Sequence, residues 1–343
     1  MRITIKDIAR ELNIAPGTVS KALSKKRGVS PRMRAEVTET AKRMGYKVNR
    51  VAQTLARAPI CIGVIIPRVW QEYYGEIAKG IAARTAILRD YNVEVEYFYI
   101  STLHSGDEMD AAVKQCVDQE VDGVLLCPAS VTGGVKSISL LREHEIPTVL
   151  VGTYIKDMPG MPVVRLASNL AGRLAAEFMS WCMPAERGAA IFIGNKDIVE
   201  HQEKVNGFHN EIQRFGREVV GVYETQDDPD LAYMLTKKIL NANPSLGGIY
   251  VATGNSVAVC RCIADQDAQE NVRIVGTDIF QDMLPYVERR IINAIIHQDP
   301  ARQGDLALMT LFQHLTNHIP LPSETLVRPN IALSCNISDY LNV

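Results

Sequence analysis

The 343-residue chain has no run of about 18 uncharged apolar residues, so no segment is long enough to form a transmembrane helix. Its first ten residues, MRITIKDIAR, carry charges where a secretory signal needs an apolar stretch. A composition of 47% hydrophobic and 22% charged residues also excludes a disordered or fibrous chain. We therefore expect a globular, cytoplasmic protein of two or three domains that does not contact a membrane.

Paired cysteine motifs are absent as well. The chain has seven cysteines, an odd number, and no CxxC pair. Most of them lie among apolar neighbours, which predicts reduced, buried thiols rather than disulfides. Cys260 and Cys262 form a lone CxC without a second ligand pair at a matching spacing, so burial in a core is favoured over a metal site.

Motifs of the common enzyme classes are missing too, since no GxGxxG, P-loop, HExxH or GxSxG occurs. His201 and His209 are too far apart for two metal ligands on one helical turn. The run Asp227-Asp228-Pro229-Asp230 could bind calcium, but an apolar helical segment follows it, which favours a helix cap. We therefore expect neither catalysis nor a cofactor or metal ion.

Charge is distributed unevenly along the chain, although the net charge is only −2. Residues 1 to 58 hold 14 Lys and Arg against 4 Asp and Glu, a net charge of +10. Because the whole chain holds 37 against 39, the remainder holds 23 against 35 and carries −12. A basic head of this kind indicates a polyanionic partner, while the acidic body serves another purpose.

Three short helices are predicted in the basic head. Thr4-Ile5-Lys6-Asp7 forms a capping box, and apolar residues at helical spacing follow to about Leu12. Pro16 suits the first position of a second helix, and Ser30 caps a third that ends at Gly45. Two short helices separated by a brief turn, in a segment of charge +10, match helix-turn-helix geometry. A small helical bundle with a solvated basic face is the alternative.

Five short motifs occur in this segment in a fixed order. They are Thr4-Ile5-Lys6-Asp7-Ile8-Ala9, Thr18-Val19-Ser20-Lys21-Ala22-Leu23, Val29-Ser30-Pro31, Gly45-Tyr46, and Asn49-Arg50-Val51-Ala52 followed by Leu55. Their order and spacing across residues 4 to 57 closely resemble the DNA-binding head and hinge of the LacI/GalR family of bacterial transcription regulators. The combined signature is highly specific, whereas each motif alone is weak.

The resemblance implies that the second helix lies in the major groove of double-stranded operator DNA. Hydroxyl groups of Thr18 and Ser20 would contact phosphates, and Lys21 would reach base edges. The family usually selects its operator through the two residues that open this helix, here Pro16 and Gly17, which offer no side-chain hydrogen bond. Base readout is therefore expected to depend on Lys21, apolar contact and DNA shape. The other implied DNA contacts are Thr4, Ser30, Asn49 and Ala52.

A hinge helix is implied between the head and the body. A helix of residues 49–57 is too short to be stable alone, because isolated helices under about 12 residues are marginal in water. By resemblance it folds when two copies pair on DNA and insert Leu55 into the minor groove. The alternative for Leu55 is a linker residue packed on the body. Paired heads imply a homodimer on a pseudo-palindromic operator, and the lack of a C-terminal leucine heptad favours a dimer over a tetramer.

The body alternates short apolar runs with amphipathic helical patterns. Helical patterns occupy Glu72–Arg89, Glu108–Gln119 and Leu170–Met183. This alternation predicts an α/β fold with parallel strands, in numbers sufficient for two sheets. The predicted strands are Cys61–Ile66, Val93–Tyr99, Val121–Cys127, Pro147–Val151, Gly188–Ile193, Val219–Tyr223, Gly248–Ala252 and Arg273–Gly276.

Open parallel sheets bind ligands beyond the carboxyl ends of their strands, so residues that follow strands are the candidates for an effector site. Aromatic faces beside carboxylate, amide and hydroxyl groups suit a polyol or sugar, whose C–H faces stack and whose hydroxyls need polar partners. The candidates at these positions are Tyr73, Tyr74, Ser130, Asn255, Asp278 and Gln298.

Three further segments, Val121–Leu126, Val275–Asp278 and Ile296–Pro300, resemble the periplasmic-binding-protein-like effector domain of the same family, nearest its ribose-binding-protein-like branch. The resemblance implies a helix-turn-helix domain at 1–46, a hinge at 47–59 and a body at 60–343. The body would have two interleaved lobes, 60–161 with 292–322 and 162–291 with 323–343. By position, Tyr73 and Tyr74 would stack on the ligand, while Asp278, Asn255 and Gln298 would bind its hydroxyls.

One departure from the family pattern concerns the ligand. Lys204 stands where these proteins commonly have an Arg, and Ser168-Asn169 replaces a usual Asp-Asn pair. A point charge grips two adjacent hydroxyls less rigidly than a planar guanidinium, which favours a modified, acidic or phosphorylated sugar over a simple one. We therefore expect a sequence-specific transcription regulator, a repressor, controlled by a small sugar-like effector. A purine-responsive or ligand-independent regulator, a sugar-binding module and an α/β enzyme are the alternatives.

Overall fold

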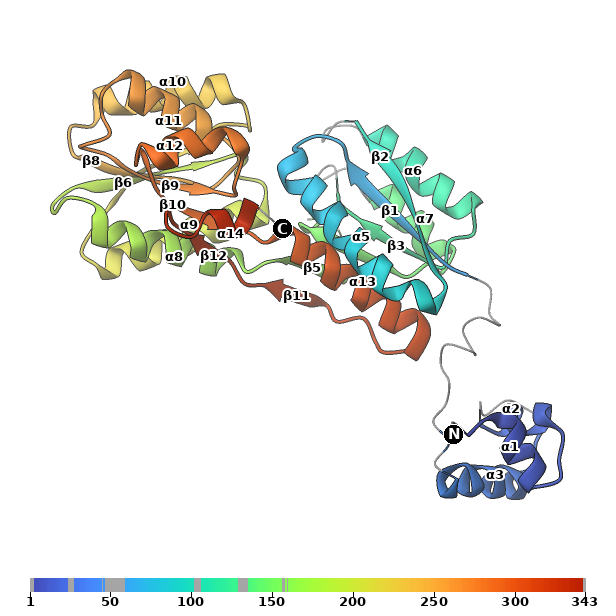
Figure 1. Ribbon diagram of the computed structural model, residues 1–343. Coiled ribbons are helices and arrows are strands. Elements are labelled where there is room, and N and C mark those ends of the chain that lie inside the picture. Colours follow the sequence, from blue (N-terminus) through green and yellow to red (C-terminus); the bar gives the residue numbers. More distant parts are fainter. Residues whose placement is uncertain are drawn as a thin grey trace. The chain divides into compact units, whose positions relative to one another are not determined.

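The structure is a computed structural model that describes residues 3–23, 28–44, 46, 59–101, 106–128, 135–155, 158 and 160–341. The described residues before Pro59 belong to one compact unit, and the strands and α-helices after it form another (Figure 1). No helix in these ranges is both long and apolar enough to cross a membrane.

The head contains α1 (Ile5–Glu11), α2 (Pro16–Leu23) and α3 (Pro31–Arg43). The predicted capping residues open two of them. The Asp7 carboxylate accepts hydrogen bonds from the Thr4 N–H at 2.9 Å and the Thr4 hydroxyl at 2.7 Å. The Ser30 hydroxyl accepts from the Met33 N–H at 3.3 Å, with Pro31 at the first helical position. Gly45, the predicted end of the third helix, lies outside the described residues.

A small apolar core joins these three helices. Its fully buried members come from all of them and include most of the predicted apolar faces, whereas Ile5, Leu12 and Leu23 are half-buried around it. Because one short face of each helix is buried, the opposite faces remain available to solvent and to a partner. The buried residues are Ile8, Ala9, Val19, Ala22, Val37 and Ala41.

The first lobe of the body is a six-stranded parallel sheet in the order β11-β5-β4-β3-β1-β2 (Figure 1). Helices α5 and α13 pack together on one face, and α6 and α7 contribute to the apolar core of the other. The strands are β1 (Ile60–Pro67), β2 (Val93–Ile100), β3 (Gly123–Leu126), β4 (Thr148–Gly152), β5 (Val163–Leu166) and β11 (Glu324–Val327). The helices are η1 (Gln71–Gly75, a π-helix), α5 (Glu76–Leu88), η2 (Arg89–Tyr91, 3₁₀), α6 (Gly106–Asp118), α7 (Val135–Glu143) and α13 (Pro300–Asn317).

The second lobe has a six-stranded sheet in the order β12-β10-β9-β8-β6-β7, parallel except where β12 pairs with β10. One apolar core packs α8 and α9 on one face, and another packs α10, α11 and α12 on the opposite face. The strands are β6 (Gly188–Ile193), β7 (Val219–Glu224), β8 (Leu246–Val251), β9 (Arg273–Thr277), β10 (Ile292–His297) and β12 (Asn330–Ala332). The helices are α8 (Ser168–Cys182), α9 (Val199–Arg214), α10 (Pro229–Ala242), α11 (Ser256–Asp265), η3 (Gln281–Met283, 3₁₀), α12 (Leu284–Glu288) and α14 (Ser338–Leu341).

The predicted strands and helices of the body are all present, because buried parallel strands read as continuous apolar runs. The predicted lobe boundaries at 161/162, 291/292 and 322/323 are wrong. Strand β5 pairs with β4 and β11 with β5, so both belong to the first lobe, whereas β10 pairs with β9 in the second. The chain therefore crosses between the lobes a few residues later each time, after β5, after β10 and after β11.

Glycines allow two helices to approach closely in the second lobe. A Cβ atom at Gly172 of α8 would lie 2.0 Å from the Lys204 carbonyl oxygen, and one at Gly207 of α9 would lie 2.1 Å from the Asn169 carbonyl oxygen. Both contacts involve backbone, which cannot rotate away. The absence of these two side chains therefore sets the position of α9 against α8.

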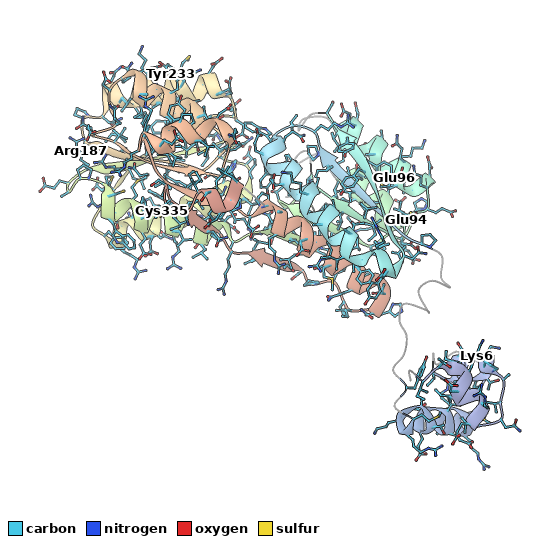
Figure 2. All side chains as sticks on the ribbon, in the orientation of Figure 1. Lys6, Glu94, Glu96, Arg187, Tyr233 and Cys335 are labelled. Atoms are coloured by element: carbon cyan, nitrogen blue, oxygen red, sulfur yellow. The ribbon has the colours of Figure 1, made fainter. Side chains whose placement is uncertain are left out.

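The cysteines follow the predicted burial in part, since Cys61 and Cys182 are only half-buried. All seven are free thiols, and Cys260 and Cys262 are buried in α11, as expected for core residues. Cys335, predicted to be buried like the others, is instead exposed on the second lobe (Figure 2). It follows β12 in the irregular segment before α14, where no neighbouring helix or strand covers it.

Candidate functional site

The exposed face of α2 carries the described candidates for base readout. Pro16, Gly17 and Lys21 are exposed, and Thr18 is half-buried, whereas Val19 faces the core. This helix therefore presents its opening turn and Lys21 away from the core of the head. The hinge candidates Asn49, Ala52 and Leu55 lie outside the described residues.

A cavity of about 420 Å³ lies between the two lobes of the body. Its lining comes from segments that follow the carboxyl ends of strands in both sheets, and from α9. This is the position at which open parallel sheets bind ligands. The cavity is in the size range of small-molecule sites in proteins, about 300–1,000 Å³.

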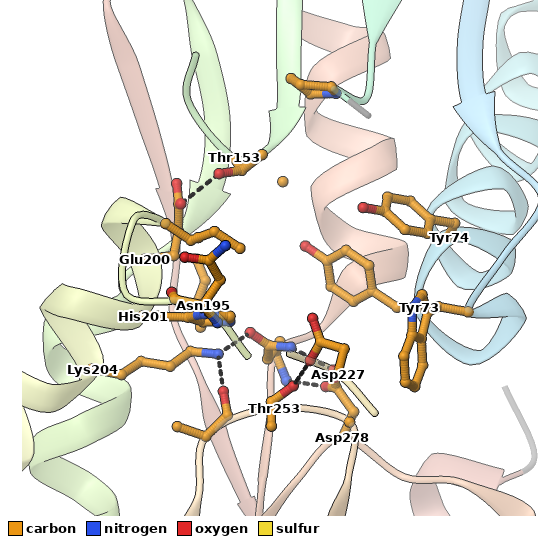
Figure 3. A pocket seen from close by; sticks show the side chains of 18 of the residues that line it. Tyr73, Tyr74, Thr153, Asn195, Glu200, His201, Lys204, Asp227, Thr253 and Asp278 are labelled. Carbon is orange, nitrogen blue, oxygen red and sulfur yellow. Dashed lines mark hydrogen bonds between the residues drawn. The ribbon is translucent and has the colours of Figure 1, made fainter. Parts of the chain in front are cut away.

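Aromatic side chains form much of the wall on the first-lobe side. Trp70, Tyr73 and Tyr74 follow β1, and the two tyrosine rings meet edge to face with centroids 5.1 Å apart. Figure 3 shows the tyrosines on one side of the cavity and Glu200, His201 and Lys204 of α9 on the other. The Tyr73 hydroxyl donates to Gln303 of α13 at 3.2 Å, which fixes the ring. The wall thus offers rigid faces for stacking.

A hydrogen-bonded chain crosses the floor of the cavity. The Asp278 carboxylate accepts from the Gln298 N–H at 2.9 Å and from the Gln298 side-chain amide. The Gln298 Oε1 accepts in turn from Lys204 Nζ at 2.9 Å, and Lys204 also donates to the Ala252 carbonyl at 3.1 Å. Burial lowers the pKa of Lys204, while nearby carboxylates, Asp278 first among them, oppose that change.

Glu200 joins the two lobes beside the cavity. It lies in the first turn of α9 in the second lobe, and its carboxylate accepts from the Thr153 hydroxyl and, at 3.2 Å, from the Tyr154 N–H, both following β4 in the first lobe. Only 6% of Glu200 is exposed. Burial raises the pKa of this carboxyl group, and the two hydrogen bonds work against the rise.

Asp227 and His201 complete the polar lining from the second lobe. The Thr253 hydroxyl donates to the Asp227 carboxylate, as drawn in Figure 3. His201 accepts from the Asn195 N–H at 3.1 Å through Nδ1. Burial, together with the nearby Lys204 ammonium, lowers the pKa of His201 to about 4, so its imidazole is neutral at pH 7.

Several lining residues adopt left-handed backbone conformations that non-glycine residues rarely use. Trp70 has φ = 50°, Gln226 50°, Asp227 57° and Asp278 56°. Each such residue costs on the order of 1–3 kcal/mol, and residues of this kind cluster at ligand sites because the turn aims a side chain. Four of them around one cavity support its assignment as the functional site of the body.

Five of the predicted effector residues line this cavity, namely Tyr73, Tyr74, Lys204, Asp278 and Gln298. Asn255 does not. It is buried and donates its amide to the Thr225 hydroxyl at 2.9 Å, because it begins α11 and turns toward the end of β7 instead of the cavity. Ser130 lies outside the described residues.

Other lining residues were not predicted as ligand contacts. Glu200 and His201 lie one helical turn before Lys204 on α9, so helical spacing from Lys204 could have found them. Asp227 was interpreted only as part of a helix cap. The cap is its neighbour Asp228, which accepts from the Asp230 N–H at 2.8 Å, and this leaves Asp227 facing the cavity. Thr153, Asn195 and Phe280 carried no local signal.

Two families match the chain. Residues 62–318 match the family described as periplasmic binding protein domain. Residues 4–49 match the family described as bacterial regulatory proteins, lacI family. The two matches cover the body and the head in turn.

Curated relatives include proteins called catabolite control protein A. That of Priestia megaterium is 27% identical over 286 residues, which cover 81% of this chain and 83% of the relative. That of Staphylococcus epidermidis (strain ATCC 12228 / FDA PCI 1200) is 28% identical over 212 residues, which cover 60% of this chain and 59% of the relative.

Solved structures with a similar fold include sugar-binding and sugar-transport proteins. A periplasmic ribose ABC transporter from Conexibacter woesei DSM 14684 gives a TM-score of 0.74 at 18% identity, covering 84% of this chain and 96% of that chain. A sugar ABC transporter (sugar-binding protein) from Bacillus halodurans gives 0.74 at 21% identity, covering 82% and 99%. At these identities the likeness concerns the two-lobed fold.

Proposed function

This chain belongs to the lacI family of bacterial regulatory proteins and to the periplasmic binding protein domain family, and on that basis we propose that a sugar-type ligand in its cavity controls its affinity for operator DNA. The lacI family consists of DNA-binding transcription regulators and not of enzymes.

The observation that carries the proposal is the lining of the cavity. Aromatic rings that follow β1 face carboxylate, amide and ammonium groups of the second lobe across a space of about 420 Å³. A sugar has apolar C–H faces that stack on aromatic rings and hydroxyl groups that need several polar partners. Sugar binding by the transport proteins of similar fold, as their titles state, supports the same ligand class.

Contacts between the lobes give the ligand a means of control. Arg165 of β5 in the first lobe donates to Glu203 of α9 in the second at 2.6 and 2.9 Å. The Trp70 ring lies against Gly254, where a Cβ would be 2.8 Å away. A ligand that touches both lobes stabilises one angle between them over others. Such differential binding is what couples two sites.

The head supplies the second site. We propose that Lys21 reads base edges in the major groove from the exposed face of α2, with Thr18 and Ser20 near phosphates. Leu55 of the hinge would enter the minor groove of a pseudo-palindromic operator bound by a homodimer, with Asn49 and Ala52 as further DNA contacts. A change in the angle of the lobes would then move the paired hinges.

A thermal-unfolding screen of the full chain against sugars, amino sugars, sugar acids, sugar phosphates and purines tests the ligand class. A ligand at about 100 times its Kd stabilises the native state by about 2.7 kcal/mol. We expect a shift with a sugar-type compound and none with the Asp278→Ala variant, which should still bind DNA. A shift produced only by purines, or retained in Asp278→Ala, would contradict the proposed site.

A further inference from the structure

The cavity that holds the proposed ligand is lined by an excess of negative charge. Three carboxylates, Glu200, Asp227 and Asp278, face it, and the lining contains one Lys and no Arg. His201 adds no positive charge at pH 7, since its pKa is lowered to about 4 by burial and by Lys204. A ligand that enters this space therefore meets a net negative charge.

The ammonium group of the one lysine in the cavity lining already donates hydrogen bonds to other groups of the protein. Lys204 is 3% exposed, and two of its three N–H groups donate to the Ala252 carbonyl and Gln298 Oε1. A phosphate or carboxylate ligand would have to share this ammonium group with those acceptors while lying near three carboxylates. In the sequence, Lys in place of the family's Arg favours an acidic ligand. In the structure, Lys204 does not provide a binding site for an anion.

The carboxylates, by contrast, are not directly paired with a Lys or Arg side chain of the described residues. Among the described residues, none of the three forms an ion pair with Lys or Arg; the His297 Nδ1 lies 3.7 Å from the Asp278 carboxylate, and Lys204 is linked to Asp278 through Gln298. Asp227 accepts one hydrogen bond, from Thr253, although a carboxylate has about four lone-pair sites. Asp227 and Asp278 both reach the cavity on left-handed turns that direct them there. Buried or half-buried carboxylates without a direct Lys or Arg partner favour a positively charged group on the ligand.

The aromatic wall favours a cation as well. Trp70, Tyr73 and Tyr74 from the first lobe and Phe280 from the second line the same space as the carboxylates. Ring faces attract an ammonium group, most strongly where water is excluded. Carboxylates combined with several aromatic faces are therefore suited to a protonated amine, while Thr153, Asn195 and Gln298 remain for hydroxyl groups.

We propose that the effector is an amine-bearing sugar whose ammonium group binds between Asp227, Asp278 and the aromatic wall, and that sugar phosphates and sugar acids are excluded. This inference rests on the proposed function, because it assumes that the cavity binds a sugar-type ligand.

The test is isothermal titration of the full chain at pH 7 with matched sets of hexoses. Each set contains the parent sugar, its 2-amino form, its N-acetylated form and its 6-phosphate, in the gluco, galacto and manno series. For at least one series we expect the amino form to bind at least ten-fold more tightly than the parent and the N-acetyl form, and the phosphate to bind most weakly.

The Asp227→Asn variant locates the effect. Asn has nearly the shape of Asp and tolerates a left-handed backbone, so the fold and the bond from Thr253 can be kept. We expect the advantage of the amino form over its parent to fall at least five-fold. Glu270→Gln, which removes the same charge from an exposed position of the second lobe, is the matched control and should leave that ratio unchanged.

Equal affinity for amino and parent forms, or tighter binding of the phosphate, would overturn the inference and leave the sugar-binding function intact. Failure of every sugar to bind would overturn the proposed function, and the inference with it. Because the matched sets are compared on the wild-type protein, the result does not depend on whether the variant folds.

Discussion

At the scale of single residues, neighbours decide what a side chain can do. Lys204 could be located as a site residue from its place in the family pattern, yet its two acceptors, Ala252 and Gln298, are far away in the sequence. Asp227 could not be located, because an adjacent Asp-Asp pair before Pro229 gives the same local signal whichever member caps the helix. Contacts that depend on tertiary structure leave no local pattern.

Lys21→Ala tests the base-reading role assigned to α2. Since Lys21 is exposed on this helix, the loss of its contact should weaken binding to the specific operator by about 1–3 kcal/mol and relax the sequence preference. Fluorescence anisotropy with specific and scrambled duplexes measures both. Lys42→Ala, the removal of an equal charge from α3, should weaken both duplexes alike. A Lys21→Ala protein with unchanged operator affinity would refute the role.

His201→Gln tests the lowered pKa of His201 through the dependence of folding stability on pH. The pKa of His201 is lowered from 6.5 to about 4 in the folded protein. Above pH 6.5 the imidazole is neutral in both states. As the pH falls from about 6.5 toward 4, only the unfolded chain gains the proton, so folding stability is lost, on the order of 2 kcal/mol.

Urea unfolding at pH 7 and pH 4.5 measures this loss. The wild-type protein should lose more stability between the two values than His201→Gln, and His209→Gln, at the other histidine of α9, is the control. Identical losses in wild type and His201→Gln would mean that His201 is accessible to protons in the folded state.

At the scale of elements, apolar runs and helical periodicity predict most of the body. Strands such as β1 and β6 are buried along nearly their whole length and are read directly from the sequence. Strands β5, β11 and β12 have only four, four and three residues, and each includes a polar residue (Arg165, Glu324, Asn330), so their apolar runs are too short to be recognised. Their sheet membership depends on partners far along the chain.

Gly207→Ala tests how α9 is held in place. The added Cβ would lie 2.1 Å from the Asn169 carbonyl oxygen, so α8 and α9 must separate. Overpacking of this kind typically costs about 1–3 kcal/mol. Because α9 carries Glu200 and Lys204, ligand binding should weaken along with stability.

Thermal unfolding and ligand titration report these two effects. Asn206→Ala, at an exposed neighbouring position on the same helix, should change stability by no more than about 0.5 kcal/mol. Wild-type stability and ligand affinity in Gly207→Ala would show that the two helices tolerate a wider separation.

At the scale of the whole molecule, contacts between the lobes link ligand binding to shape. The sequence pattern predicts two interleaved lobes, but all three predicted crossings are misplaced, because a strand's own residues do not specify which sheet it joins. The ion pair between Arg165 and Glu203 lies near one such crossing, with Glu324 of β11 also bound to the same guanidinium at 2.9 Å.

Arg165→Met should destabilise the protein by about 2 kcal/mol. Removal of one partner of a fully buried pair costs about 3–5 kcal/mol, but the carboxylates of Glu203 and Glu324 are 30% and 33% exposed, which reduces the cost. Urea unfolding measures it. Arg173→Ala is the control, because Glu211 keeps Arg214 as a partner and the loss should stay under about 1 kcal/mol. Equal losses of stability in Arg165→Met and Arg173→Ala would mean that the ion pair between the lobes contributes little to folding stability.

Whether a ligand in the cavity controls DNA binding is tested most directly by the affinity of the full chain for an operator duplex, measured with and without saturating ligand. The protein itself selects this duplex from a random pool. Coupling of about 1–3 kcal/mol predicts a change of about 5-fold to 150-fold in wild type, an equal effect of DNA on ligand affinity, and no change in Asp278→Ala. An operator affinity that stays the same at saturating ligand would contradict control of DNA binding from the cavity.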